Sequence, residues 1–113
     1  MVAPLSLFTE LEEAAAELMA AQAHYAEAAN DAATAKANLE YKRADLICQG
    51  IEGKNAEQRE AMLRLALFQD YADLLTVEQE AIRTKCRLER AQTALTVIRY
   101  KIRLLEVMKG AES

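Results

Sequence analysis

The sequence has few of the residues that build sheets, tight turns and compact mixed folds. Its 113 residues include three glycines, one proline, two phenylalanines and no tryptophan. Folds that contain sheets need glycine and proline in their turns and are enriched in aromatic residues in their strands. Because these residues are scarce while alanine, leucine and charged residues abound, the composition favours long helices. We expect one all-α domain spanning residues 1–113.

Side chains that carry out catalysis or bind metals are scarce as well. His24 is the only histidine, and Cys48 and Cys86 are the only cysteines. No GxSxG, HExxH or CxxC motif is present, so neither a nucleophile–base pair nor a zinc site of ordinary spacing can be identified. The sequence therefore predicts a protein that is not an enzyme and that uses no cofactor or metal.

Long hydrophobic runs are also missing. No apolar stretch approaches the ~18 residues of a membrane-spanning helix, and the first residues, MVAPLSLFTELEE, lack the basic start of a signal peptide. Two cysteines without a disulfide pattern are compatible with a reducing compartment. We expect a cytoplasmic protein without a membrane partner.

The second half of the chain carries an apolar stripe with steps of four and three residues. A period of about 3.5 residues, kept over many turns, is typical of a left-handed coiled coil. Only Asp70 and Thr84 interrupt its apolar character. The stripe consists of Leu63, Leu67, Asp70, Leu74, Val77, Ala81, Thr84, Leu88, Ala91, Leu95, Ile98, Ile102 and Leu105.

The first half carries a second stripe of the same period. It consists of Leu7, Leu11, Ala14, Leu18, Ala21, Tyr25, Ala28, Ala32, Ala35, Leu39, Lys42 and Leu46. Between the stripes, Gly50 and Gly53 interrupt the helix, and Asn55 can cap a new one. We expect helix 6–48, loop 49–54 and helix 55–109, packed as an antiparallel two-helix coiled-coil hairpin.

A hairpin folded about residue 51 predicts the pairing and leaves two apolar surfaces uncovered. Leu11 is expected opposite Ala91, so residues 97–109 extend beyond the first helix. The back of the second helix is also apolar, and contiguous apolar patches mark interfaces. We therefore expect a helical-bundle homo-oligomer. Its predicted interface residues are Phe68, Leu75, Ile82, Ile98, Ile102 and Leu105.

The charges are distributed unevenly along the chain. Residues 5–31 contain six acidic residues and no lysine or arginine, whereas residues 83–109 contain eight basic residues against Glu89 and Glu106. The simplest interpretation is that these segments lie side by side in the hairpin. Binding of nucleic acid by the basic segment is the alternative, although the aromatic residues that would stack on bases are nearly absent there.

The loop is the one segment with the character of a ligand site. Its glycines allow close approach of a ligand, and the first N–H groups of the following helix can hold a phosphate or carboxylate. An anion such as a nucleotide would contact Gly53, Lys54, Asn55 and Arg59. A structural turn with a solubilising lysine is the competing interpretation.

The loop motif resembles that of a group of small phage and prophage proteins predicted to be helical hairpins. The matching pattern is Gly50-x-Glu52-Gly53-Lys54-Asn55-Ala56-Glu57-x-Arg59-x-Ala61-x-Leu63. The resemblance implies a viral accessory protein in the cytoplasm of the bacterial host, and it brings no catalytic residues. We expect it to bind and block or sequester a host component. A counter-defence sponge for nucleotide second messengers, a nucleic-acid-binding protein and a structural adaptor remain the alternatives.

Overall fold

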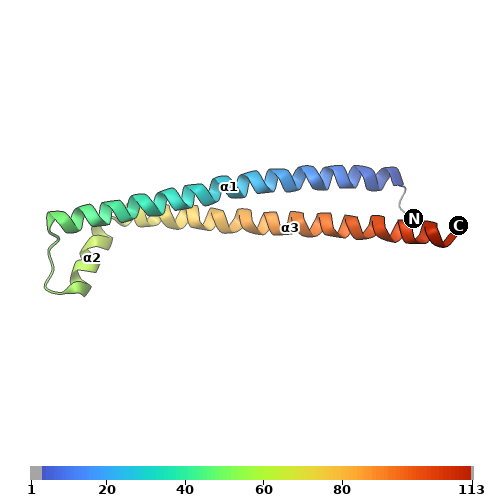
Figure 1. The fold of residues 1–113 in the computed structure, drawn as a ribbon. Coiled ribbons are helices and arrows are strands. Elements are labelled where there is room, and N and C mark those ends of the chain that lie inside the picture. Colours follow the sequence, from blue (N-terminus) through green and yellow to red (C-terminus); the bar gives the residue numbers. More distant parts are fainter. Residues whose placement is uncertain (1–3, 113) are drawn as a thin grey trace. The chain divides into compact units, whose positions relative to one another are not determined.

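The computed structural model describes residues 4–112, and within them every regular element is a helix. The helices are α1 (Pro4–Gln49), α2 (Ala56–Ala66) and α3 (Phe68–Glu112) (Figure 1). The all-α prediction is confirmed, and α1 matches the expected first helix closely. The expected single second helix is wrong, because it is divided into α2 and α3 at Leu67.

The loop between α1 and α2 follows the expected backbone chemistry. Gly50 takes a left-handed φ of 89°, and its N–H donates to the carbonyl of Ile47 (3.1 Å), which closes the end of α1. Asn55 caps α2, since its side chain accepts a hydrogen bond from the N–H of Gln58 (2.8 Å). At Gly53, an added Cβ would lie 2.9 Å from the backbone nitrogen of Arg59, so only glycine fits without a shift.

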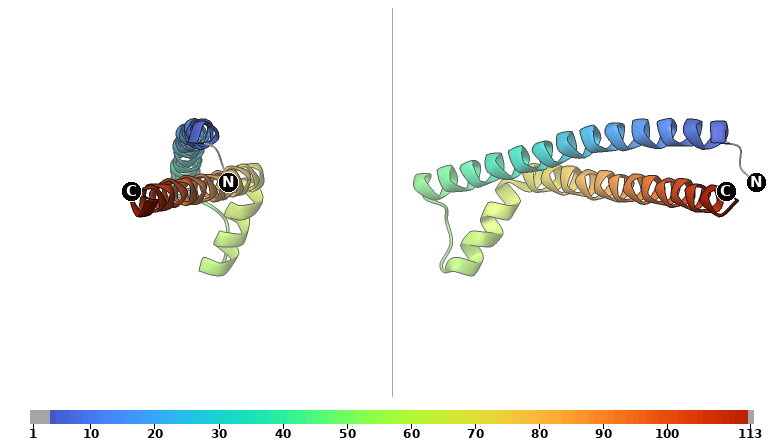
Figure 2. Two further views of the ribbon diagram at one scale, coloured as in Figure 1. Left: turned by 90° about the vertical axis from the view of Figure 1, so that its right-hand side faces the viewer. Right: turned by 45° about the vertical axis from the view of Figure 1, so that its right-hand side comes forward.

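The break between α2 and α3 is confined to one residue. Leu67 has φ −109° and ψ 26°, values that residues other than glycine also adopt. The N–H of Leu67 still donates to Leu63 (2.9 Å), and the N–H of Tyr71 to Leu67 (3.0 Å). The two views of Figure 2 show that α2 leaves the line of α3 at this point. The chain therefore bends here while keeping these backbone hydrogen bonds.

The chain divides into two compact units, which we call the terminal unit (residues 4–25 with 83–112) and the loop unit (residues 26–82). In each unit, the heptad stripes form the interior. The positions of the stripe over residues 63–105 are all buried or half-buried, and those of the stripe over residues 7–46 are too, apart from the exposed Lys42. The most deeply buried residues are Leu7, Ala21, Thr84 and Ala91 in the terminal unit, and Ala28, Leu39, Leu63 and Leu67 in the loop unit.

In the terminal unit, the start of α1 runs antiparallel to the end of α3 (Figure 1). Leu7 and Leu11 share a small hollow with Ile102 and Leu105. The expected pairing of Leu11 with Ala91 is therefore wrong. It assumed that the second helix begins to pair with α1 directly after the loop, whereas α2 occupies those residues.

In this register, residues 97–109 lie beside α1 instead of extending past it. The expectation that they have nothing of their own chain to cover them is wrong, since Ile102 and Leu105 lie against α1 and Ile98 is half-buried. Ile98, Ile102 and Leu105 were predicted to lie in an interface between copies because nothing of their own chain was expected to cover them. With α1 beside this segment, that reason no longer applies. Phe68, Leu75 and Ile82, by contrast, are exposed, as the sequence predicts.

In the loop unit, the charged members of the two stripes meet each other. The ammonium group of Lys42 lies 2.6 Å from a carboxylate oxygen of Asp70. An exposed ion pair contributes little to stability, but a polar pair within an apolar seam selects the register, because other registers place a charge against apolar side chains. Lys42 and Asp70 therefore specify how α1 and α3 align in this unit.

Candidate binding surfaces

Three helices of the loop unit meet at Arg43. This residue of α1 donates two hydrogen bonds to the carboxylate of Glu60 in α2 (2.9 and 2.8 Å) and one to the hydroxyl oxygen of Tyr71 in α3 (2.6 Å). Arg64 adds to the group, with a guanidinium nitrogen 3.5 Å from Glu60 and its carbon 5.1 Å from the centre of the Tyr71 ring. We call these four residues the Arg43 clasp. It attaches α2 to both long helices.

The clasp changes the acidity of its members. Hydrogen bonding to Arg43, with its positive charge and that of Arg64, lowers the pKa of Glu60. The same bonds to Glu60 and Tyr71 raise the pKa of Arg43. A depressed carboxylate pKa stabilises the fold above the pKa of the unfolded chain, and this contribution disappears as the pH falls through the folded-state pKa. The clasp is therefore expected to weaken in acid, as the pH falls through the lowered pKa of Glu60.

Replacing Arg43 with methionine, which keeps much of the side-chain length, should release α2. We expect a lower thermal midpoint at pH 7 and faster hydrogen exchange over residues 56–66. At a second, more acidic pH, below the lowered folded-state pKa of Glu60, this carboxylate takes up a proton and the difference from the wild type should shrink. Lys36→Met, at an exposed position of the same helix, is the control and should change neither measurement. An equal loss at both pH values would argue against the ion pair as the cause.

A second ion-pair group joins the two helices of the terminal unit. Arg87 of α3 binds the carboxylate of Glu17 in α1 through two hydrogen bonds (2.7 and 3.0 Å) and also contacts the imidazole of His24. Hydrogen bonding to Arg87 lowers the pKa of Glu17. The predicted proximity of the acidic and basic segments is confirmed at this pair. His24 is exposed.

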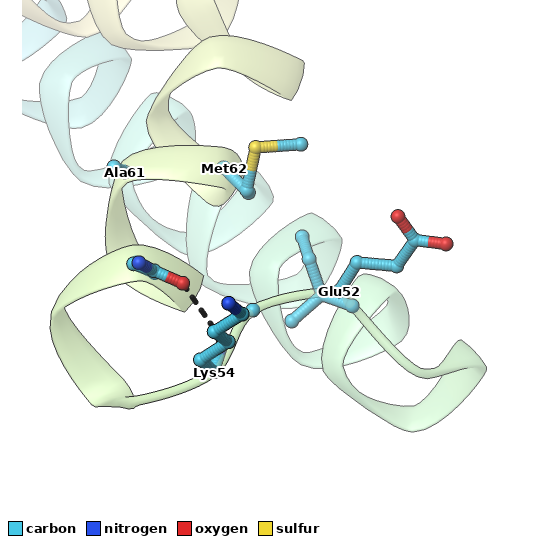
Figure 3. Close-up of a pocket in the computed structure, with 7 residues that line it drawn as sticks. Glu52, Lys54, Ala61 and Met62 are labelled. Carbon is cyan, nitrogen blue, oxygen red and sulfur yellow. Dashed lines mark hydrogen bonds between the residues drawn. The ribbon is translucent and has the colours of Figure 1, made fainter.

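The loop borders an open hollow of about 690 Å³, which Figure 3 shows between the loop and α2. Glu52 and Lys54 lie on the loop side, while Ala61 and Met62 belong to α2. The backbone N–H of Lys54 donates to the side chain of Gln58 (2.9 Å). Since the N–H of Gln58 is bound by Asn55, two donors that an anion would use already have partners.

The four residues predicted to hold an anion lie close together, and two of them are engaged within the loop itself. Gly53 and Lys54 line the hollow, whereas Asn55 caps α2 and the guanidinium group of Arg59 donates to the carbonyl of Gly53 (3.4 Å). Asn55 and Arg59 therefore have structural roles in the loop. Anion binding here stays a prediction, and the carboxylate of Glu52 at the same hollow opposes it.

One exposed apolar face of α3 belongs to the loop unit. Phe68, Leu75 and Ile82 follow each other at seven-residue steps and are 70%, 59% and 63% exposed. The segment 68–82 contains Asp70, Asp73, Glu78 and Glu80 and no lysine or arginine. We call it the acidic apolar face. Side chains of this size in a row on one helix are typical of a surface that another helix covers.

A different exposed apolar face of α3 belongs to the terminal unit. Val97, Tyr100, Leu104 and Val107 are exposed and follow the same three- and four-residue steps as the buried seam. The segment 93–108 also contains Arg99, Lys101 and Arg103 against the single acid Glu106. We call it the basic apolar face. The predicted interface residues of this segment, Ile98, Ile102 and Leu105, are half-buried on the seam side instead.

Among residues 4–112, no group of three or more histidine, cysteine, aspartate or glutamate side chains is placed to hold a metal ion. No helix in this range combines the length and apolar character needed to cross a bilayer. Cys48 and Cys86 are both exposed free thiols. No protein-family model, curated protein or solved structure matches the chain.

Proposed function

We propose that the protein is a non-catalytic accessory protein that binds a polypeptide by packing helix against helix. The observation that carries this proposal is the acidic apolar face. The side chains of Phe68, Leu75 and Ile82 are exposed to solvent, on a helix whose other side forms the buried seam. Burying such a side chain on binding yields about 1.5–3 kcal/mol, so a row of them can hold a partner.

The charge of this face indicates the chemistry of the partner. Glu78 lies beside the apolar row, three residues after Leu75 and four before Ile82, and no basic residue lies between positions 68 and 82. A partner helix with an apolar stripe bordered by lysine or arginine would match both properties. In the role that the loop resemblance suggests, this partner is a basic amphipathic helix of a host protein, which the chain blocks or sequesters.

The setting that we propose is the reducing cytoplasm of a bacterial host. Exposed free thiols such as Cys48 and Cys86 persist in that environment and tend to oxidise outside it. The homo-oligomer expected from the sequence is also part of the proposal.

Photo-crosslinking can test the proposal directly. A photoreactive amino acid at Leu75 or Ile82 should link the protein to one polypeptide in producing cells, whereas the same group at Asp73 should not. Asp73 is exposed on the same helix but lies outside the apolar row, so it controls for general proximity. After purification of that partner, Leu75→Ser should weaken its binding at least tenfold. Unchanged affinity would reject the acidic apolar face as the binding surface.

A further inference from the structure

The basic apolar face of the terminal unit is a narrow row on the outer side of α3. Val97, Tyr100, Leu104 and Val107 follow each other at three- and four-residue steps, and all four are exposed. This spacing places them on the side of α3 that faces away from the buried seam. A narrow apolar row with a period of about 3.5 residues is typical of a surface that a second helix covers lengthwise.

Two basic side chains border the row, one on each side. Lys101 lies four residues after the first member of the row and three before the third, so it adjoins the row. Arg103 lies three residues after the second member and four before the last, which places it along the other border. Arg99 and Glu106 have neither spacing and point away from the row. Both borders are therefore positively charged.

The charges of these two side chains are not used within the terminal unit. Arg87, which borders the buried seam of the same helix, is paired with Glu17 of α1. In the part of the chain that the structure describes, no carboxylate lies within ion-pair distance of Lys101 or Arg103. Their charges are available to a partner with acidic side chains.

From the row and its borders we infer that the basic apolar face binds a helix of another protein, with an apolar row bordered by glutamate or aspartate. In paired helices, charged residues beside the apolar seam select the partner by opposite charge. The site lies in the terminal unit and shares no residue with the acidic apolar face, so it does not rest on the proposed function. The chain then has two helix-binding surfaces with opposite charge preferences.

Other anionic or apolar partners fit this face less well. Tyr100 is the only aromatic residue of the row, so it offers little for the stacking of nucleic-acid bases. The aliphatic side chains of Val97, Leu104 and Val107 gain little beside a phosphate backbone. A lipid surface takes up a broad apolar face, whereas this row is narrow. The same face of a second copy would bring like charges together.

Binding of a labelled acidic peptide tests the inference with the full chain. The peptide is an amphipathic helix of about four heptads, with leucine and isoleucine in its seam and glutamate along both borders. Fluorescence anisotropy should show binding in the micromolar range. Leu104→Ser should weaken it at least tenfold, because the apolar contact at the centre of the row is lost. Leu104 is exposed, so the fold should persist, as circular dichroism will show.

Reversing one charge tests which partner chemistry the face selects. Lys101→Glu should weaken binding of the acidic peptide about fivefold, since carboxylates then face each other across the contact. Lys109→Glu is the matched control, with the same change in net charge on the same helix. Lys109 is exposed and lines the small hollow with Leu7 and Leu105, on the side of α3 that faces α1. Its reversal should change the affinity less than about twofold.

Several results would overturn the inference. They are no peptide binding at about 100 µM, equal binding by Leu104→Ser and the wild type, or equal effects of Lys101→Glu and Lys109→Glu. Displacement of the peptide from this face by duplex DNA, by vesicles of anionic lipid or by a second copy of the chain would also overturn it.

Leu75→Ser separates this inference from the proposed function. Leu75 belongs to the acidic apolar face, so the substitution should weaken binding of the crosslinked partner and leave the affinity for the acidic peptide unchanged. Leu104→Ser should have the opposite pair of effects. Loss of peptide binding in Leu75→Ser would place the peptide on the acidic apolar face and overturn the inference. Failure of either proposal therefore leaves the other standing.

Discussion

Replacing Leu63 with alanine is expected to remove a large part of the stability of the protein. Leu63 is only 3% exposed and lies in α2, next to the bend at Leu67. Truncation of a buried leucine costs about 2–5 kcal/mol, because apolar contacts are lost and a cavity remains. Small proteins have only about 5–15 kcal/mol in total, so the unfolding midpoint in urea should fall steeply.

Leu65 provides a matched control for this measurement. It belongs to the same helix but is 71% exposed. Leu65→Ala removes the same atoms from a site that water already reaches, so the free energy of unfolding should change by no more than about 0.5 kcal/mol. Equal losses in the two variants would mean that α2 does not pack through Leu63 as the structure has it.

Enlarging Ala21 to leucine is expected to have the second largest effect. Ala21 is completely buried in the terminal unit, and the register of Leu11 with Ile102 places it in the same layer as the buried Ala91. Two small residues in one layer leave no room for a longer side chain. Overpacking a core position costs about 1–3 kcal/mol, which chemical denaturation can measure.

Ala23→Leu is the control for Ala21→Leu. Ala23 lies two residues further along α1 and is exposed. Alanine and leucine have similar helix propensities, so the added atoms should be tolerated there with a change within about 0.5 kcal/mol. A tolerated leucine at position 21 would show that the helices are further apart in this layer than the structure indicates.

Much of the fold could be predicted from the sequence because its repeats are local. The stripes fixed which side of each helix is buried, and Gly50, Gly53 and Asn55 fixed where α1 ends and α2 begins. Each of these features depends on residues close together in the chain. Side-chain spacing and backbone preference determine them almost alone.

The register could not be predicted from the stripes, because the same pattern recurs at every step. Ala91 and Ile102 are both members of the stripe, with Leu95 and Ile98 between them. Leu11 would therefore face an apolar residue in either register. One signal in the sequence does select the register. Lys42 and Asp70 are the charged members of their stripes, and they pair with each other.

The bend at Leu67 and the Arg43 clasp were missed for a related reason. No glycine or proline lies near Leu67, and the helical pattern continues through it. Arg43, Glu60 and Tyr71 are separated in the sequence and belong to three helices, so only the tertiary structure brings them together. Charged residues on helix surfaces are common, and spacing alone does not distinguish a clasp from a solvated face.

The bend leaves the position of α2 dependent on a few side chains. The seam passes from Leu63 through Leu67 to Asp70 in regular steps, so the sequence pattern alone also matches an unbroken helix over residues 56–112. Leu67 donates to Leu63 and accepts from Tyr71 in the bent form, so its own backbone groups are paired there. We therefore expect the bent arrangement to be held chiefly by the contacts of Arg43 with Glu60 and Tyr71. Neutralising Glu60 or competing for Arg43 is then expected to loosen α2 without unfolding the long helices.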